Sequence, residues 1–133
     1  MRIYFAGPLF TEAEREWNES AAAILERLGH EVFLPQRDAS QVNESVRGLL
    51  DSEIVLANLN GPMADDGTCF EVGVGWAKRK DIIAYRDDWR SAGDDGRGNL
   101  MLTQCVDCLL PSFADAVAYI EERYSQRMEI PPR

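Results

Sequence analysis

The sequence is poor in the residues that metal and redox sites use most. It contains one histidine, His30, and three cysteines, Cys69, Cys105 and Cys108. An odd number of cysteines does not build a disulfide framework, and the C-V-D-C pair has no second pair to complete a four-ligand zinc site. We therefore expect no metal and no cofactor, and we interpret the C-V-D-C cysteines as buried thiols in a β-strand.

The chain also lacks any hydrophobic run long enough to cross a bilayer, and its N-terminal MRIYFAGP enters a strand without a long apolar signal region. Basic residues are in the minority, with 14 Lys plus Arg against 23 Asp plus Glu and a net charge of −9. A uniformly acidic surface repels phosphate backbones and anionic lipids, which argues against nucleic-acid polymers and membranes as partners. We expect a cytoplasmic protein with a small-molecule ligand.

No internal repeat, low-complexity segment or linker interrupts the sequence, and 133 residues fit one domain. We expect this domain to cover residues 1–126, followed by a C-terminal tail over 127–133. Short apolar runs alternate with helical patterns along the whole length. This alternation indicates a doubly wound, flavodoxin- or Rossmann-like α/β sandwich with about five parallel strands and helices on both faces.

The individual elements follow from local patterns. Thr11 and Glu14 fit a capping box at the start of the first helix, Gly29 fits its end, and Ser112 fits the N-cap of the last helix. We expect strands at 2–7, 30–35, 54–59, 81–86 and 106–110, and helices at 12–29, 44–53, 70–80, 99–105 and 112–125.

In such a fold, ligands bind beyond the carboxyl ends of the strands. Three loops should meet there, at residues 6–8, 58–68 and 86–99. The unusual polar clusters of the chain lie in these loops. The sequence therefore predicts that the functional site lies at this edge of the sheet.

The segment ADDGTCFEVGVGWA, residues 64–77, places Glu71 where the surrounding pattern is apolar. Asp65 or Asp66 can cap a helix that opens at Gly67, and a glutamate in its first turn gains from the helix dipole. A capping role is thus one interpretation of Glu71. The glycines behind it favour another, because small residues let a second chain segment pack close to the helix.

Asp65 precedes Glu71 by six residues with a turn between them, so both carboxylates can face one cleft. Paired carboxylates suit glycosyl chemistry, in which one attacks an anomeric carbon and the other binds hydroxyls or handles protons. The transition state resembles an oxocarbenium ion and is stabilised by a nearby anion. A deoxyribose, which has no 2-hydroxyl, forms such a cation more easily.

Three motifs, in this order, resemble those of the nucleoside 2-deoxyribosyltransferases: I-Y-F-A-G-P at 3–8, D-D-G-T-C-F-E-V-G at 65–73 and N-L-M at 99–101. The resemblance implies an enzyme of nucleotide salvage that moves 2-deoxyribose between nucleobases through a covalent glycosyl-enzyme intermediate. Its partners would be a nucleoside, a free nucleobase and further copies of the chain, in a dimer or hexamer.

The resemblance also implies roles for the matching residues. Glu71 would attack C1′ of the sugar, the Tyr4 hydroxyl would position Glu71, and Asp65 would bind sugar hydroxyls. Asn99 would reach the site of a neighbouring subunit. Without the resemblance, Tyr4 could equally be a core tyrosine and Asn99 a helix cap. The expected substrate-binding residues are Gly7, Pro8, Gln36, Ser45, Asp66, Gly67, Asn99 and Met101.

The sequence departs from the family at Ser45, where members commonly carry an aspartate that contacts the base. Serine is a poor proton donor, so either Glu44 substitutes or base recognition is unusual. Gln41 competes with Gln36 for the expected contact to the base.

Two alternative functions remain open. The first is an N-glycosidic hydrolase of (deoxy)nucleosides or deoxynucleoside 5′-monophosphates. The second is a non-catalytic nucleotide-binding domain. The loop G-P-L-F-T-E-A-E-R, residues 7–15, carries acids where phosphate donors would be needed, and Arg15 is the only base nearby. This composition favours nucleosides over nucleotides.

Overall fold

The computed structural model describes residues 1–88, 90 and 99–129. Most of the expected polar loop at 87–98, and the end of the expected tail, therefore lie outside the described residues. In chain order the elements are β1 (Arg2–Ala6), α1 (Glu12–Arg27), β2 (Glu31–Phe33), α2 (Pro35–Asp38), α3 (Val42–Asp51), β3 (Ile54–Asn58), α4 (Asp66–Ala77), β4 (Asp81–Tyr85), α5 (Leu100–Cys105), β5 (Cys108–Leu110) and α6 (Phe113–Glu129).

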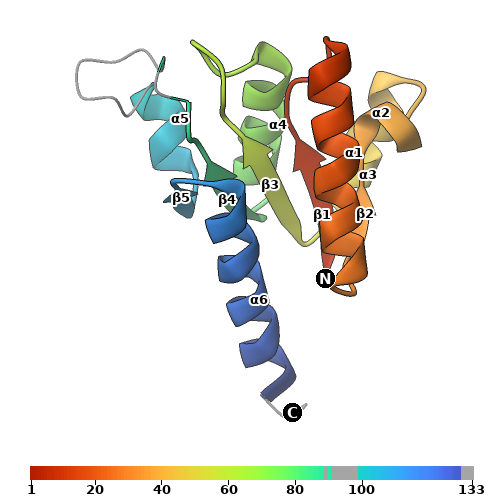
Figure 1. Ribbon diagram of the computed structural model, residues 1–133, viewed down its shortest axis with the longest axis vertical. Helices are drawn as coiled ribbons and strands as arrows, with labels where there is room; N and C mark the ends of the chain where they lie inside the picture. Colours follow the sequence, from red (N-terminus) through yellow and green to blue (C-terminus); the bar gives the residue numbers. More distant parts are fainter. Residues whose placement is uncertain (89, 91–98, 130–133) are drawn as a thin grey trace.

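The five strands form one parallel sheet in the order β2-β1-β3-β4-β5. This is the strand order of flavodoxin-like proteins, in which the chain reverses its winding between β1 and β3. The expected doubly wound α/β fold is thus confirmed (Figure 1). The central strand β3 is buried at all five positions, as a parallel strand covered on both faces should be.

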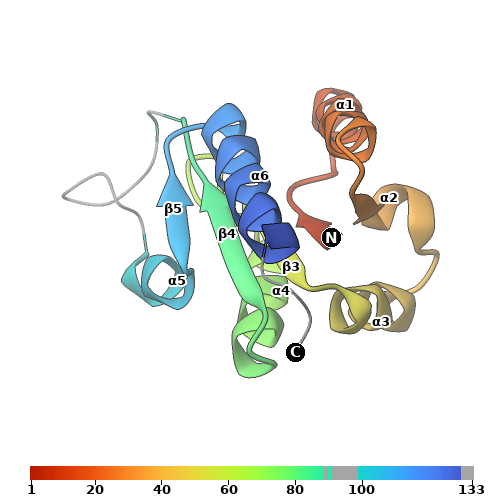
Figure 2. The same ribbon diagram turned by 90° about the horizontal axis from the view of Figure 1, so that it is seen from below.

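Helices cover both faces of the sheet, as the view from below shows (Figure 2). Helices α1 and α6 lie on one face, where Phe5, Leu25 and Ile120 belong to one apolar core. Helices α3, α4 and α5 lie on the other, where Tyr4, Leu49 and Val72 belong to a second core. The face with Tyr4 is the one that also carries the helix of Glu71.

The helix ends follow the sequence signals closely. Thr11 and Glu14 form the complete capping box of α1, with hydrogen bonds of 2.8 and 3.1 Å. Gly29 follows Leu28, the C-cap residue of α1, with a left-handed φ of 94°. The Ser112 hydroxyl accepts a hydrogen bond from the Asp115 amide at 3.1 Å. These predictions rested on local hydrogen bonding, and all three are confirmed.

Two stretches differ from expectation. Residues 35–38 form the short helix α2 instead of a loop, because Pro35 is preset for a helix start and the Asp38 carboxylate accepts the Leu34 amide at 2.8 Å. Helix α6 continues to Glu129, past the expected domain boundary at 126. Two arginines of α6 hold it to the start of the sheet: Arg123 and Arg127 bind Asp81 at 3.1 and 3.2 Å.

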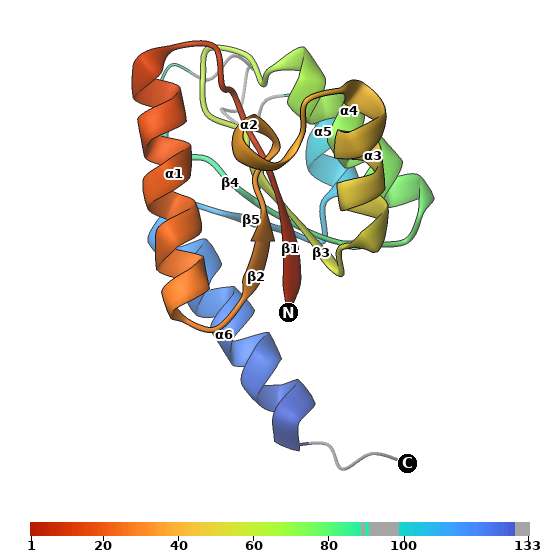
Figure 3. The ribbon, with the colours of Figure 1, turned by 90° about the vertical axis from the view of Figure 1, so that its right-hand side faces the viewer.

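Gly48 of α3 lies directly against the Phe33 side chain of β2, and both elements can be seen in Figure 3. A Cβ added at Gly48 would fall 2.5 Å from the Phe33 ring, so only glycine fits there. The Phe33 ring in turn stacks on the Tyr4 ring, with centroids 5.5 Å apart. A chain of contacts therefore runs from α3 through Phe33 to Tyr4. Among the described helices, none combines the length and apolarity needed to cross a membrane.

Candidate active site

Glu71 lies in the second turn of α4, not in the first turn as expected, because the helix begins earlier, at Asp66. The N-cap is Asp65, so the reciprocal position of a capping box falls on Thr68. A capping role for Glu71 is therefore wrong. Its side chain is half-buried, and Oε2 is fully buried without a hydrogen-bond partner among the described residues. Such a carboxylate is costly to bury and needs a reason other than helix stability.

Tyr4 comes to the same place from the middle of β1. Its side chain is 0% exposed, and its hydroxyl has no hydrogen bond of good geometry within the described part of the chain. Burial raises the pKa of Tyr4 well above its usual range. The Glu71 charge adds to that rise, and the Ser45 hydroxyl opposes it. Tyr4, Ser45 and Glu71 are thus brought together from β1, α3 and α4, although nothing in the sequence spacing links them.

The carboxyl of Glu71 is the most perturbed acid of this group. Burial raises its pKa from the ordinary 4.5 to about 7, the Tyr4 hydroxyl lowers it, and the Asp65 charge raises it further. The carboxylate is therefore poised near neutral pH, where it can exist either as an anion or as an acid. Strongly perturbed carboxyls of this kind concentrate at functional sites.

The two carboxylate oxygens of Asp65 have different surroundings. Its Oδ2 accepts the Thr68 amide at 3.0 Å and the Thr68 hydroxyl at 3.1 Å, which makes Asp65 the cap of α4. Its Oδ1 makes no hydrogen bond within the described residues and remains open to a ligand. The next residue, Asp66, is exposed and binds the Gly67 amide at 2.8 Å. Asp65 and Asp66 therefore have different roles: the charge of Asp65 acts on Glu71, whereas Asp66 stabilises the turn at the start of α4.

The loop after β1 is fixed by a residue that the sequence analysis missed. Asn18 of α1 is buried, and its amide donates to the Pro8 carbonyl at 2.9 Å and to Oε1 of Gln36 at 3.0 Å. Gln36 also donates to the Arg15 carbonyl at 3.0 Å. The signal was present in the sequence, because Asn18 is a polar residue on the buried face of α1.

The structure shows the surroundings of Gln36, Gly7 and Glu44. The Gln36 amide faces α1, where Oε1 accepts a hydrogen bond from Asn18 and Nε2 donates one to the Arg15 carbonyl. At Gly7 an added Cβ would lie 3.1 Å from Cβ of Asn58, so the loop needs a small residue there. Glu44 binds the Ser40 amide and hydroxyl at 2.7 and 3.0 Å, and those bonds lower its pKa. Glu44 is thus an ionised residue at the start of α3 rather than a substitute acid.

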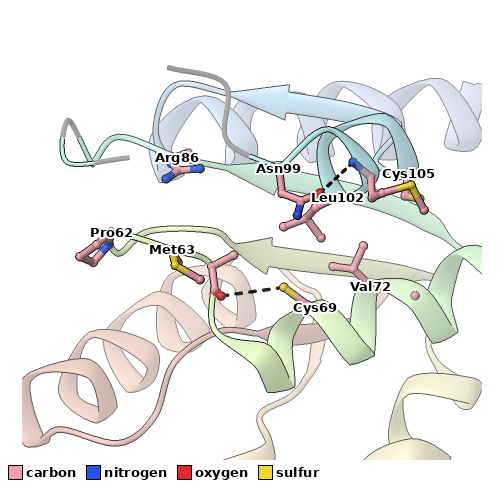
Figure 4. Close-up of a pocket in the computed structure, with 11 residues that line it drawn as sticks. Pro62, Met63, Cys69, Val72, Arg86, Asn99, Leu102 and Cys105 are labelled. Carbon is pink, nitrogen blue, oxygen red and sulfur yellow. Dashed lines mark hydrogen bonds between the residues drawn. The ribbon is translucent and has the colours of Figure 1, made fainter. Parts of the chain in front are cut away.

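Asn99 and Met101 lie on the opposite side of α4 from Glu71. They border a cleft of about 610 Å³ between α4 and α5 (Figure 4). The α4 residues that face this cleft include Cys69 and Gly73. In a helix of about 3.6 residues per turn, Glu71 points away from that side. The Asn99 side chain also caps α5 by accepting the Met101 amide at 2.9 Å.

The remaining lining residues of the cleft are mostly apolar, with one cation among them. Arg86 donates weakly to the Gly61 carbonyl at 3.4 Å, and its Nε is buried without a partner among the described residues. The cysteines are free thiols, all half-buried, and Cys105 ends α5 instead of lying in a strand as expected. Within the described residues, no group of three or more potential metal ligands gathers.

These features define a flavodoxin-like α/β protein in which a half-buried carboxylate, with one buried and unpartnered oxygen, lies beside a tyrosine hydroxyl and a second acid. The sequence profile described as nucleoside 2-deoxyribosyltransferase matches residues 3–113. The chain belongs to the nucleoside 2-deoxyribosyltransferase family, which is a family of enzymes. The resemblance inferred from the three motifs is confirmed.

Solved structures with the same fold include proteins from several bacteria. A conserved protein from Enterococcus faecalis V583 is 25% identical, with 92% of this chain and 98% of that chain covered and a TM-score of 0.81. A 2-deoxyribosyltransferase from Bacillus psychrosaccharolyticus is 21% identical, with coverages of 90% and 92% and a TM-score of 0.69. A CMP N-glycosidase from Clostridium botulinum is 18% identical, with coverages of 91% and 99% and a TM-score of 0.61. A search of curated protein sequences finds no match.

Proposed function

We propose that this protein transfers 2-deoxyribose between nucleobases, with Glu71 as the nucleophile. One observation carries the proposal: a half-buried carboxylate with an unpartnered oxygen is held beside the Tyr4 hydroxyl in a member of this family. A carboxylate that had only a structural role would have its oxygens satisfied. Because Oε2 is buried, the attacking atom in this proposal is Oε1, which makes no hydrogen bond within the described residues.

The reaction proceeds in two displacements at C1′ of the sugar. In the first, an oxygen of Glu71 forms a bond to C1′ while the C1′–N bond breaks, and the base departs with the electron pair and takes a proton from solvent. In the second, a nitrogen of the incoming base attacks C1′. The C1′–O bond then breaks, Glu71 regains its charge, and the new base loses a proton. In the reacting complex, the Tyr4 hydroxyl beside the carboxylate would donate a hydrogen bond to it and so fix its orientation.

The free Oδ1 of Asp65 supplies an acceptor for a sugar hydroxyl beside the nucleophile. The loop over residues 7–15 favours a nucleoside over a nucleotide. The Arg15 guanidinium there donates to the Leu9 and Phe10 carbonyls at 3.2 and 2.9 Å, so it is already engaged in holding the loop. Free nucleosides and bases as substrates fit a salvage role in the cytoplasm.

The active unit in this proposal is a homo-oligomer, a dimer or a hexamer built from dimers. Asn99 lies across α4 from Glu71 of its own chain, so it can serve only the site of a neighbouring copy. The outer side of α4 and α5 carries large apolar side chains, with Phe70 59%, Trp76 61% and Met101 79% exposed. Gly73 leaves open space between them, which allows a second helix to approach closely.

The test is an assay of the purified protein with thymidine or 2′-deoxyinosine, with and without free adenine or cytosine, followed by chromatography. A new deoxynucleoside that forms only with the acceptor base supports the proposal. Free base released in equal amounts with and without an acceptor would mean hydrolysis instead. Glu71→Ala should abolish turnover. Ligand affinity without turnover in the wild-type protein would show a binding domain.

A further inference from the structure

A second concave surface lies at the other end of the sheet, where the strands begin. This hollow has a volume of about 460 Å³. We call it the basic hollow, because five cationic residues line it: Arg2, Lys78, Arg79, Lys80 and Arg127. The chain as a whole has a net charge of −9, so five cations in one hollow depart from the general charge of the surface.

The acids that line the basic hollow are mostly engaged already. Asp81 binds Arg123 and Arg127 at 3.1 and 3.2 Å, and Glu53 binds Arg127 at 3.4 Å. Asp51 also lines the hollow and has no partner among the described residues. On the cationic side, Arg2, Lys78 and Arg79 make no side-chain hydrogen bond or ion pair in the part of the chain that the structure describes. Three unpaired cations therefore face one unpaired acid.

The backbone of Arg79 supplies an independent observation. Helices α1 and α4 end with the same pair of hydrogen bonds: Gly29 and His30 donate to Glu26 and Leu25, and Arg79 and Lys80 donate to Trp76 and Gly75. The residue after the cap is left-handed in both, with φ of 94° at Gly29 and 56° at Arg79. Glycine adopts this conformation freely, whereas an arginine is strained there. A cationic side chain therefore lines the hollow at a position where glycine would cost less backbone strain.

We infer that the basic hollow binds the phosphate group of a small anion, at a site separate from that of Glu71. The chemistry is that of a phosphate dianion, whose oxygens accept charge-assisted hydrogen bonds from several Lys and Arg donors at once. The inference goes beyond the proposed transfer reaction and does not depend on it. The competing explanation is that Lys78 and Arg79 only complement the dipole at the end of α4.

Calorimetric titration of the full chain with inorganic pyrophosphate at low ionic strength tests the inference. Arg79→Gly and Lys78→Ala should each weaken binding by about tenfold, the loss expected for one charge-assisted hydrogen bond. Arg27→Ala is the matched control, because Arg27 is the basic residue in the last turn of α1. It should bind as the wild type does.

Arg79→Gly also separates binding from folding, because it should raise the Tm while it lowers the affinity. Absence of pyrophosphate binding in the wild type, or an unchanged affinity in Arg79→Gly, would overturn the inference. An equal loss in Arg27→Ala would also overturn it, since it would reduce the effect to general surface charge. A parallel titration of Glu71→Gln with thymidine 5′-monophosphate distinguishes an organic phosphate from an inorganic one as the ligand. If Glu71→Gln binds the nucleotide and the added change Arg79→Gly weakens that binding, the ligand is an organic phosphate. If only pyrophosphate binds, the ligand is an inorganic phosphate.

Discussion

The Tyr4 hydroxyl and the Glu71 carboxylate affect each other's ionisation from two different layers of the fold. Tyr4 belongs to the sheet and Glu71 to the helix that covers it. Tyr4 lowers the pKa of Glu71, and the charge of Glu71 raises the pKa of Tyr4. Burial is the largest influence on both. The pair therefore remains sensitive to pH and to any change that alters its solvation, and the first two predictions rest on this coupling.

The pH dependence of activity should follow the ionisation of Glu71. The anion is the attacking form and the pKa of Glu71 is about 7, so kcat/KM should rise with pH up to about 7 and level off above it. Glu71→Gln should reduce kcat by at least about a thousandfold at every pH. Chromatographic rate measurements between pH 5 and 9 would check both. A wild-type profile that stays flat across pH 7 would contradict the assignment.

The same pKa predicts a stability effect. A carboxyl whose pKa is higher in the folded state than its ordinary 4.5 keeps its proton longer when folded, so wild-type stability should fall as pH rises from 4.5 to 7. Glu71→Gln removes this loss. Urea unfolding should show the variant more stable than the wild type at pH 8, by roughly 3 kcal/mol at most, and equal to it near pH 4. A lower stability at pH 8 would indicate that Glu71 holds the fold together.

Tyr4→Phe should separate positioning from packing. The stacked contact with the Phe33 ring is retained, so the variant should fold normally. Loss of the interaction between the Tyr4 hydroxyl and the Glu71 anion should lower kcat by about ten- to a hundredfold. The pKa of Glu71 should rise further, so the midpoint of the pH–rate profile should move to higher pH. Leu25→Ala, in the other core, is a control that should lower the Tm without moving that profile.

Two substitutions of Asp65 should have different effects. Asp65→Ala removes the cap of α4 and should cost roughly 1 kcal/mol of stability. Asp65→Asn keeps an oxygen for the Thr68 amide and should preserve stability. Both variants remove the charge that raises the pKa of Glu71, so both should move the pH–rate midpoint downward. Thermal unfolding and KM for thymidine, measured side by side, distinguish the capping role from the sugar contact.

Mixed oligomers can test the contribution of Asn99 to a neighbouring site. Glu71→Ala and Asn99→Ala should each be inactive or weak alone. Unfolded together and refolded, they should recover about a quarter of the wild-type activity, because half of the dimers are mixed and each has one intact site.

The matched control for that experiment is Glu71→Ala mixed with Asp65→Ala. Both residues serve the same site from one chain, so every site of the mixed dimer carries one of the two substitutions and none is intact. Activity should therefore stay at the average of the two separate variants. Recovery in the control, or none with Asn99→Ala, would show that the sites do not share Asn99 across subunits.

The sequence predicted those features that depend on short-range hydrogen bonding or on the order of elements. The capping box of Thr11, the cap at Ser112 and the parallel sheet belong to this group. Relationships across layers were not accessible in the same way. The proximity of Ser45 to Tyr4, and the position of Asn99 on the far side of α4, depend on how the helices pack. Gln36 illustrates the limit: the sequence suggested a contact with the base, whereas its position in α2 and its hydrogen bond with Asn18 required the structure.

Gly48 has a consequence for the whole active site. The absent side chain leaves room for the Phe33 ring against α3, and that ring stacks on Tyr4. A single added methyl group at residue 48 would push the Phe33 ring away from α3. The shift would pass through the ring stack to the Tyr4 hydroxyl beside Glu71. The placement of the Tyr4 hydroxyl therefore depends on the smallest residue of α3, which lies outside the candidate site.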